Sequence, residues 1–341
     1  MAIKPATTEH RLEESTGCIA ITAKYQNPDT LRSVWQLVNS LIPFIITWYL
    51  MYKSLEVSYL FTLLLSLLAA GFLVRIFIIF HDCGHGSFFK SKRANQIIGF
   101  TTGVLTFSPY YQWSHDHAVH HATAGDLDRR GVGDIWTMTV HEYNQANLWV
   151  RIWYRVYRNP FFMFGVGGIF LFFLKNRFPS KGARKREYIS VMWTNATLLI
   201  LFVILGLSLG ITTLLIIHVP IMLVAATAGI WLFYVQHQFE HVYWDKSDSW
   251  SFVRAALEGS SYYKLPKILQ WFSGNIGFHH IHHLSPRIPN YYLEKCHFEN
   301  AVFQNTQPIT LLHSLKSLQF RVWDEKQRKL IGFKNLRQLR R

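Results

Sequence analysis

Cysteine, acidic residues and charged residues in general are scarce in this chain. Its 341 residues include three cysteines, Cys18, Cys83 and Cys296, which are too few and too far apart for the disulfide framework of a small secreted domain. Charged residues make up 16% of the sequence, against roughly 25% in an average soluble protein. Half of the residues are hydrophobic, and this amount of buriable apolar surface excludes an intrinsically disordered chain.

The charge that is present is strongly unbalanced. Lys and Arg number 35 against 20 Asp and Glu, which gives a formal net charge of +15. Such an excess is typical of a nucleic-acid-binding protein or of a membrane protein whose basic loops face the cytoplasm. The first 33 residues mix both charge signs and lack a basic stretch followed by an apolar run, so no cleaved signal peptide is expected.

Long apolar runs decide between these two classes. The second run contains 24 residues and a single charge, Arg75. As a helix it would extend about 36 Å, which is enough to cross a hydrocarbon core of about 30 Å. The pattern predicts an all-α integral membrane protein with four transmembrane helices in two hairpins, rather than buried helices of a soluble protein. The four runs cover residues 34–52, 57–80, 189–209 and 211–236.

The basic residues lie outside these runs and mostly on one side of them. Segments 1–33, 81–188 and 237–341 contain 4, 14 and 15 Lys and Arg residues, whereas the two hairpin tips contain only Lys53. This distribution predicts that both termini and the middle segment face the cytoplasm from the cell's cytoplasmic membrane, and it argues against a nucleic-acid partner. The predicted organisation is a cytoplasmic N-terminal segment (1–33), hairpin 1 (34–80), a cytoplasmic or interfacial segment (81–188), hairpin 2 (189–236) and a cytoplasmic segment with a basic tail (237–341).

Two shorter apolar runs, 97–113 and 161–174, are rich in glycine. Runs of 10 to 14 apolar residues are more typical of interfacial or re-entrant segments than of full spans. We therefore expect 97–113 to form an interfacial or re-entrant helix pair. The predicted helical cap over the four spans carries the histidine clusters described next.

Histidine is abundant, with 17 copies, and twelve of them fall into four clusters. Residues at positions i, i+3 and i+4 share one face of a helix, and three of the clusters have this spacing. Neutral imidazole is a good ligand for iron, zinc or copper. Eight or nine imidazoles exceed the four ligands of one tetrahedral zinc ion and predict a site for two metal ions. The clusters are H-D-C-G-H (81–85), H-D-H-A-V-H-H (115–121), H-Q-F-E-H (237–241) and H-H-I-H-H (279–283).

The order and flanks of these clusters resemble those of a known family. H-x-x-x-H, H-x-x-H-H and H-x-x-H-H, placed around these spans, are similar to the histidine boxes of the membrane-bound fatty-acid desaturases. The strings R-I-F-I-I-F-H-D-C-G-H (75–85) and G-N-I-G-F-H-H-I-H-H-L-S-P-R-I-P-N-Y (274–291) most resemble the bacterial acyl-lipid (phospholipid) desaturases of the delta-5 type. The resemblance extends from about residue 31 to residue 333.

The resemblance implies a centre of two non-haem iron ions that uses O2 as co-substrate. Acyl-lipid members of the family have one more ligand in a Q-H motif, here Gln236-His237, whereas other branches place it where this chain has His241. We favour His237 and keep His241 as the alternative, and we expect His115 and His280 to be structural. The implied ligands are His81, His85, His117, His120, His121, His237, His279, His282 and His283.

Polar residues beside the clusters are candidates to orient the metal-bound imidazoles through their second ring nitrogen. For each of them, a solvated loop residue or a helix cap is the alternative interpretation. The candidates are Asp82, Asp116, Glu240 and Asn275, together with Asp126, Asp128 and Asp134 in the loop after the second cluster.

The resemblance implies an oxidoreductase that introduces a cis double bond into acyl chains of membrane phospholipids in the lipid bilayer and so adjusts membrane fluidity. The sequence shows no H-P-G-G motif of a fused cytochrome b5, no iron–sulfur cysteine pattern and no dinucleotide-binding glycine fingerprint. A separate electron donor, ferredoxin or flavodoxin, is therefore implied. A basic cytoplasmic surface that includes Lys264, Lys267 and Arg287 would attract such an acidic protein.

Three other functions stay open at this point. A di-iron membrane hydroxylase of alkanes or carotenoids has the same histidine pattern but adds an oxygen atom. A zinc-dependent membrane hydrolase would hold zinc instead of iron. A histidine-rich metal transporter would not be an enzyme and would carry ionisable residues within its spans, where this sequence has only Arg75 and His218.

Overall fold

A computed structural model describes residues 17–338 of the chain. The first 16 residues of the predicted N-terminal segment and residues 339–341 of the predicted basic tail lie outside the described residues. The described part is mostly helical, and its strands form two small two-stranded sheets. The predicted fold class is confirmed, since four of the helices are long and apolar enough to cross a membrane.

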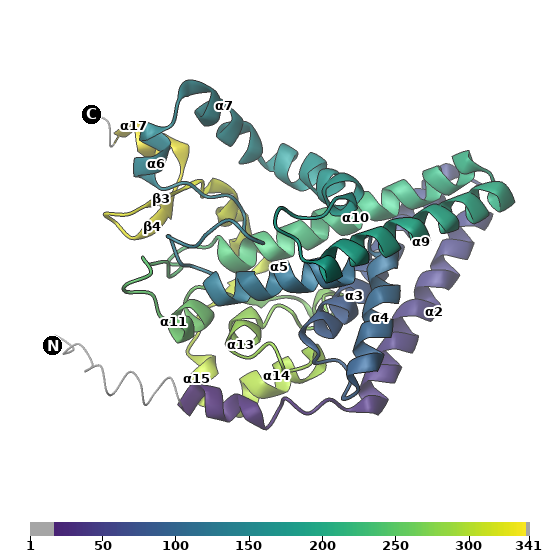
Figure 1. Cartoon of the computed structure of the whole chain (residues 1–341), viewed down its shortest axis with the longest axis horizontal. Coiled ribbons are helices and arrows are strands. Elements are labelled where there is room, and N and C mark those ends of the chain that lie inside the picture. Colours follow the sequence, from purple (N-terminus) through teal and green to yellow (C-terminus); the bar gives the residue numbers. More distant parts are fainter. Residues whose placement is uncertain (1–16, 339–341) are drawn as a thin grey trace.

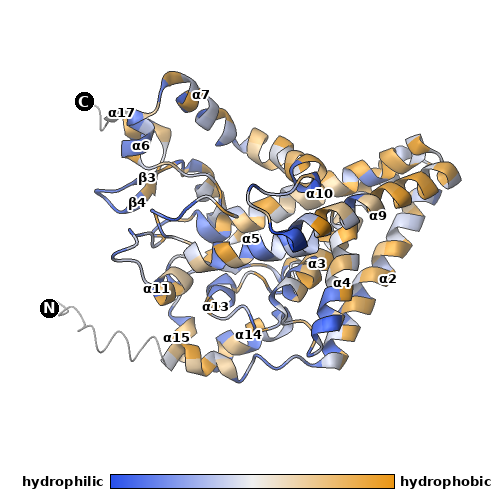
Figure 2. Cartoon of the chain, in the orientation of Figure 1, coloured by the Kyte–Doolittle hydropathy of each residue, from blue (hydrophilic) through white to orange (hydrophobic). Residues whose placement is uncertain are grey.

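These four helices pack as two antiparallel pairs that extend to one side of the molecule (Figure 1). Helix α10 also packs against α3, which joins the two pairs. Apolar residues cover the free ends of the long helices, whereas the loops of the cap are more hydrophilic (Figure 2). The helices are α2 (Thr30–Ser54), α3 (Tyr59–His85), α9 (Lys185–Leu209) and α10 (Ile211–His237).

Local capping explains where these helices begin and end. The Asp29 carboxylate accepts a hydrogen bond from the Arg32 amide at the start of α2, as a helix N-cap does. Gly86 ends α3 in the left-handed conformation (φ 70°) that glycine adopts without strain. Helix α3 therefore continues five residues beyond the predicted apolar run and carries His81 and His85 in its last turns.

The charge inside the second span has partners within the protein. The guanidinium of Arg75 is buried, donates to the Trp271 carbonyl and lies 3.9 Å from the centroid of the Trp271 ring. An ideal Cβ at Gly71 would lie 2.9 Å from the ring of Phe272, so the glycine lets this aromatic ring reach α3. The short helix α12 (Lys267–Phe272) is thereby held against the apolar part of α3.

The apolar run 97–113 forms two short helices rather than one span. Helices α4 (Lys92–Leu105) and α5 (Tyr110–Thr123) are joined by a tight turn in which Phe107 has a left-handed φ of 56°. Their close packing depends on Gly99, because an ideal Cβ there would lie 2.2 Å from the Tyr110 ring. Helix α5 packs against α3, so the second histidine cluster lies beside the first.

The run 161–174 is helical throughout, and a break separates it from the helix that precedes it. Helix α7 (Leu148–Tyr157) and the helical segment Phe161–Arg177 are long and apolar enough to cross a membrane only when taken together. They are bent by 67° at the break between them. Among the described residues, the number of candidate spans is thus four, or five if this pair is one broken span. The segment consists of η1 (Phe161–Val166), α8 (Gly167–Ile169), η2 (Phe170–Leu174) and η3 (Lys175–Arg177).

The remaining elements form a cap at one end of the long helices (Figure 1). Strand β1 (Tyr262–Lys264) pairs in parallel with β2 (Pro308–Thr310), and β3 (Val322–Asp324) pairs antiparallel with β4 (Lys329–Ile331). The cap also contains α6 (Val140–Gln145), α11 (Phe252–Leu257), α13 (His279–Leu284), α14 (Asn290–Glu299), α15 (Ala301–Gln304), α16 (Leu311–Ser314), η4 (Leu315–Gln319) and α17 (Phe333–Gln338).

Candidate metal centre

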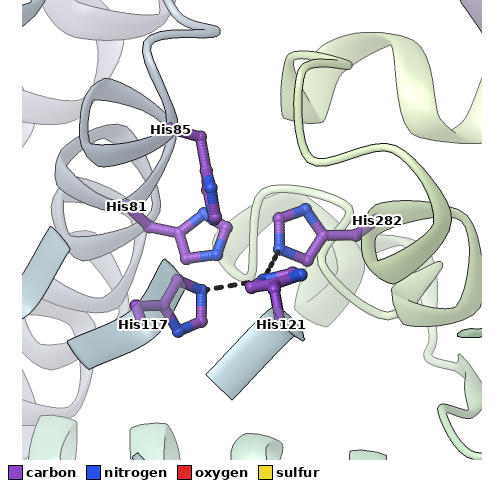
Figure 3. Close-up of side chains that lie close together, drawn as sticks. All are labelled: His81, His85, His117, His121 and His282. Carbon is purple, nitrogen blue, oxygen red and sulfur yellow. Dashed lines mark hydrogen bonds between the residues drawn. The ribbon is translucent and has the colours of Figure 1, made fainter. Parts of the chain in front are cut away.

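The four histidine clusters meet where the long helices enter the cap. Helices α3, α5, α10 and α13 each contribute imidazoles, and the ligand nitrogens form two groups within which all lie no more than 4.8 Å apart. The members of the larger group point toward one another from three helices (Figure 3). This five-histidine group contains His81, His85, His117, His121 and His282, and the three-histidine group contains His120, His237 and His283.

Short nitrogen–nitrogen distances link the imidazoles in both groups. His121 Nε2 lies 3.1 Å from His117 Nε2 and 3.0 Å from His282 Nε2. His237 Nε2 lies 3.1 Å from His120 Nε2. Two nitrogen ligands at right angles on one metal ion, each about 2.1 Å from it, are about 3.0 Å apart. The observed spacing therefore fits imidazoles that share a metal ion.

His279, the ninth predicted ligand, lies at the edge of the three-histidine group. Its Nε2 is 3.0 Å from His237 Nε2, and its ring centroid is 4.6 Å from that of His283. The remaining predicted ligands all belong to one of the two groups. The structure thus brings together all nine predicted histidines, from segments up to 202 positions apart in the sequence.

The backbone before α13 explains how its histidines reach the centre. Asn275 and Gly274 both have left-handed φ values, 58° and 53°. An ideal Cβ at Gly277 would lie 2.3 Å from the Tyr263 carbonyl oxygen, so only glycine allows this approach to β1. The following helix turns His279, His282 and His283 inward. His280 points elsewhere, and its Nε2 lies 3.3 Å from His297 Nδ1.

Burial favours the neutral form of five of these imidazoles. Desolvation, and then the neighbouring histidines, hold the pKa of His117, His121 and His282 well below the ordinary value for histidine. The same causes lower the pKa of His279 and His283. Neutral imidazole is the form that binds a metal ion. In addition, His85 Nε2 and His283 Nε2 are buried without a hydrogen-bond partner, which is costly unless such an atom binds a metal. The residues present therefore fit a metal centre.

Two carboxylates contact histidines of the two groups. His81 Nδ1 lies 3.0 Å from Asp82 Oδ1, and His120 Nδ1 lies 2.6 Å from Asp134 Oδ1. A carboxylate on the second ring nitrogen fixes the tautomer of a metal-bound histidine and raises its basicity. Asp82 also accepts hydrogen bonds from the backbone and side-chain nitrogens of Asn290 at 2.7 and 2.8 Å, which ties α3 to α14.

The other candidate orienting residues have different partners. Asp116 accepts a hydrogen bond from Ser180 Oγ at 3.1 Å, and Glu240 lies 3.7 Å from Lys316 Nζ at the surface. Asn275 accepts from Gln270 and donates to the Asn290 carbonyl, so its place is in the turn before α13. His241, the alternative ligand, is exposed with a left-handed φ of 64° and belongs to neither ligand group.

The three aspartates of the loop after α5 also differ in their partners. Asp134 contacts a predicted ligand, His120. Asp126 is instead buried against Arg129 and Ser247, and Asp128 accepts a hydrogen bond from the Ser247 amide. Nothing in the spacing of these residues separates them, since the loop folds back on α5 only in the tertiary structure. Gly133 permits that return, because its ideal Cβ would lie 3.0 Å from His120 Cβ and its φ is 71°.

An aromatic residue at the centre was missed by the sequence analysis. The indole of Trp113 stacks on His117 with ring centroids 4.4 Å apart and an interplanar angle of 26°. It fits there because Gly84, between the two histidines of the first cluster, has no side chain; an ideal Cβ would lie 2.9 Å from the indole. The available signal was the spacing, since Trp113 precedes His117 by one helical turn.

Comparison with known proteins agrees with this geometry. A sequence model of the fatty acid desaturase family matches residues 58–308, which include all nine predicted ligands. The chain therefore belongs to the fatty acid desaturase family and is an oxidoreductase of that class.

Individual relatives of this chain are also named as desaturases. A fatty acid desaturase of Bacillus subtilis is 50% identical over 333 residues, which cover 98% of this chain and 94% of that protein. An sn-1 oleoyl-lipid 12-desaturase of Synechocystis sp. is 28% identical, over 65% of this chain and 63% of its own length. An sn-1 acyl-lipid omega-3 desaturase (ferredoxin) of Synechocystis sp. is 27% identical, over 64% and 62%.

Proposed function

We propose that this protein introduces a cis double bond, at the delta-5 position, into acyl chains of phospholipids in the cytoplasmic membrane. The observation that carries the proposal is the convergence of nine buried or half-buried histidines at the cap ends of the long apolar helices, eight of them in two groups and His279 beside the smaller group. Two non-haem iron ions bound there would supply the activation of O2 that breaking an unactivated C–H bond requires.

The overall reaction balances with two external electrons. One acyl CH2–CH2 unit, one O2, two electrons and two protons give one CH=CH unit and two water molecules. The names of two relatives, an oleoyl-lipid and an acyl-lipid desaturase, support a lipid-bound acyl chain as the substrate. The delta-5 position rests on the resemblance of residues 75–85 and 274–291 to desaturases of that type.

The protein's own residues have three tasks in this chemistry. The histidines of α3, α5, α10 and α13 bind the metal ions as neutral imidazoles. Asp82 and Asp134 accept a hydrogen bond from His81 and His120 and hold their tautomers. The apolar helices place an acyl chain in the bilayer next to the centre, and the surrounding cap keeps bulk water away from it.

We further propose that both termini and the cap face the cytoplasm, as the excess of Lys and Arg in these segments indicates. The electron donor is then a soluble cytoplasmic protein. The name of one relative contains ferredoxin, which supports a ferredoxin, and a flavodoxin is chemically equivalent as an acidic one-electron carrier.

Expression in a bacterial host that lacks delta-5 unsaturated fatty acids tests the function. Analysis of the fatty-acid methyl esters is expected to show a new monounsaturated acid that is absent with His120→Ala at equal protein level. An added oxygen atom would instead indicate a hydroxylase. An unchanged profile in the presence of a reduced donor would contradict the proposal. Metal analysis that finds zinc without iron would favour a hydrolase.

A further inference from the structure

The two ligand groups differ in how close they come to the surface. All three members of the three-histidine group are buried, with exposed fractions of 1% to 7%. In the five-histidine group, His85 and His117 are only partly buried. Because electron transfer slows steeply with distance, the edge formed by these two partly exposed residues is the shortest entry for an electron from solvent.

The surroundings of this open edge allow a close approach by another protein. Gly86 follows His85 directly and is exposed, and Ala118 and Ala122 are exposed on α5. Ser114 Oγ donates to the Gly84 carbonyl at 2.7 Å and so holds the end of α3 against α5. This hydrogen bond links the backbone next to His85 to the helix that carries His117.

Two basic segments flank the open edge. Lys90, Lys92 and Arg93 are exposed between α3 and α4, and the segment 181–186 adds four exposed basic residues before α9. The second segment is held close to α5, since the Arg186 guanidinium lies 3.7 Å from the Tyr111 ring centroid.

The carboxylates of this region are engaged. Asp116 accepts from Ser180 on the loop before α9, and Glu187 is buried and paired with Arg184. Within residues 17–338, Lys90, Lys92, Arg93, Lys181 and Lys185 form no ion pair, so their charges stay uncompensated.

Four other guanidinium groups of the cap are each matched by a carboxylate. Matched pairs of this kind contribute little to the attraction of an acidic partner from a distance. The pairs are Arg129–Asp126, Arg130–Glu142, Arg254–Glu258 and Arg328–Asp245. The five unpaired basic residues beside the open edge therefore contribute more to a long-range positive field than these four paired guanidinium groups do.

We propose that this open edge, with its flanks 90–93 and 181–186, is the docking surface for the electron donor, an acidic one-electron carrier protein. This inference rests on the proposed function, which requires two electrons per double bond. Two reduced carriers in succession each give one electron through the His85 and His117 edge and leave oxidised. Such transient encounters depend on charge and weaken as ionic strength rises.

Charge reversal on one flank tests the surface. The full-length iron-loaded protein, in nanodiscs of neutral phosphatidylcholine, is assayed for double-bond formation at increasing concentrations of a reduced acidic ferredoxin. In Lys181→Glu/Lys185→Glu the KM for ferredoxin is expected to rise about tenfold, with kcat nearly unchanged and a weaker salt dependence. Lys326→Glu/Lys329→Glu on the β3–β4 hairpin makes the same charge change at a distance and is expected to keep the wild-type KM.

A second readout does not depend on turnover. Zero-length carbodiimide cross-linking of ferredoxin to the protein, followed by peptide mapping, is expected to join ferredoxin carboxylates to Lys90, Lys92, Lys181 or Lys185. Cross-links confined to Lys326 and Lys329, or an equal rise in KM for both double variants, would overturn the inference. A wild-type protein that forms no double bond with either ferredoxin or dithionite would instead refute the proposed function, while the cross-links still report on docking.

The same lysines are also suited to hold anionic lipid headgroups. Nanodiscs that contain phosphatidylglycerol separate the two roles. If Lys181→Glu/Lys185→Glu loses only the thermal stabilisation by phosphatidylglycerol and keeps the wild-type KM for ferredoxin, the flank binds lipid and the docking surface is refuted.

Discussion

The two groups of histidines are built in different ways from the same side chain. In the five-histidine group, His81 and His85 come from one helix and His117 and His121 from another, each pair at i and i+4. In the three-histidine group, α5, α10 and α13 contribute one residue each. The first group is thus largely made by helical periodicity, and the second exists only when three separate elements pack together.

Because the two groups are built differently, we expect them to differ in how well they retain a metal ion when one histidine is lost. If one imidazole of the five-histidine group is lost, four remain, which is still enough for a single four-coordinate ion. The three-histidine group has only four imidazoles even when His279 is counted with it, so the loss of one leaves too few. Mutations that disturb tertiary packing are expected to affect the three-histidine group first.

Removal of one ligand from each group is the strongest test of this comparison. In His237→Ala we expect about half of the iron to be lost and desaturation to fall by more than the roughly 100-fold that follows loss of an orienting partner. In His85→Ala, with four histidines left in the group, we expect iron to be largely retained although activity falls. Iron analysis of the purified proteins measures the difference. Equal iron loss in both variants would show that the groups do not differ in tolerance.

The carboxylates that orient the ligands provide a test of intermediate size. Asp134→Asn is expected to weaken iron binding about 10- to 100-fold through His120, with little effect on folding because Asp134 lies in a loop. Asp82→Asn is expected to have a similar effect through His81 and, in addition, to lower the unfolding free energy by about 1–3 kcal/mol, because Asp82 also holds Asn290.

Iron titrations and thermal unfolding separate these two contributions. An unchanged iron affinity in Asp134→Asn would show that the Asp134–His120 hydrogen bond has no influence on the centre.

A packing change near the five-histidine group is expected to have a smaller effect. Gly84→Ala would place a Cβ 2.9 Å from the Trp113 indole, and overpacking of this kind costs about 1–3 kcal/mol. The displaced indole no longer stacks on His117, so kcat is expected to fall several-fold at nearly full iron content.

Gly229→Ala in α10 is the matched control, because nothing lies within 4 Å of its ideal Cβ. Thermal unfolding and activity should stay close to wild type there. If Gly84→Ala behaves in the same way, the stacking of Trp113 has no functional role.

Substitution of His241 is expected to have the smallest effect on iron content and activity. The sequence alone made His241 an alternative to His237 as a metal ligand. His241→Asn removes the imidazole and retains a residue that tolerates the left-handed backbone conformation. Because His241 is exposed and outside both groups, iron content is expected to be unchanged and activity to stay within about twofold of wild type. A loss of iron in this variant would make His241 a ligand and would contradict the assignment of His237.

Elements with a strong periodic signal were predictable from the sequence. The apolar runs predicted four long helices because a bilayer-spanning segment has a fixed minimum length. The boundaries were less accurate: the structure extends α3 to His85 and begins α9 at Lys185, since polar residues can continue a helix once it leaves the apolar region. The interruption of 97–113 followed from the requirement that two histidine clusters meet.

The partners of the ligands were not predictable in the same way. Asp82, Asp116, Glu240 and Asn275 are all near a histidine in sequence, yet only Asp82 contacts a predicted ligand, and Asp134 reaches one from a loop. A hydrogen bond needs two atoms within about 3 Å in a suitable orientation. Sequence proximity does not specify this for residues in turns, where the backbone direction depends on the packing around it.

The long helices, the family and the set of histidines could be inferred from the chain's residues, because apolar length and the i, i+3, i+4 spacing are properties of short segments. The packing of distant segments specifies which histidine of the 237–241 cluster joins a group and which carboxylates contact the predicted ligands. It also leaves one edge of the five-histidine group open beside uncompensated lysines. These features depend on contacts between segments far apart in the chain, and such contacts are fixed only when the apolar helices and the cap pack together.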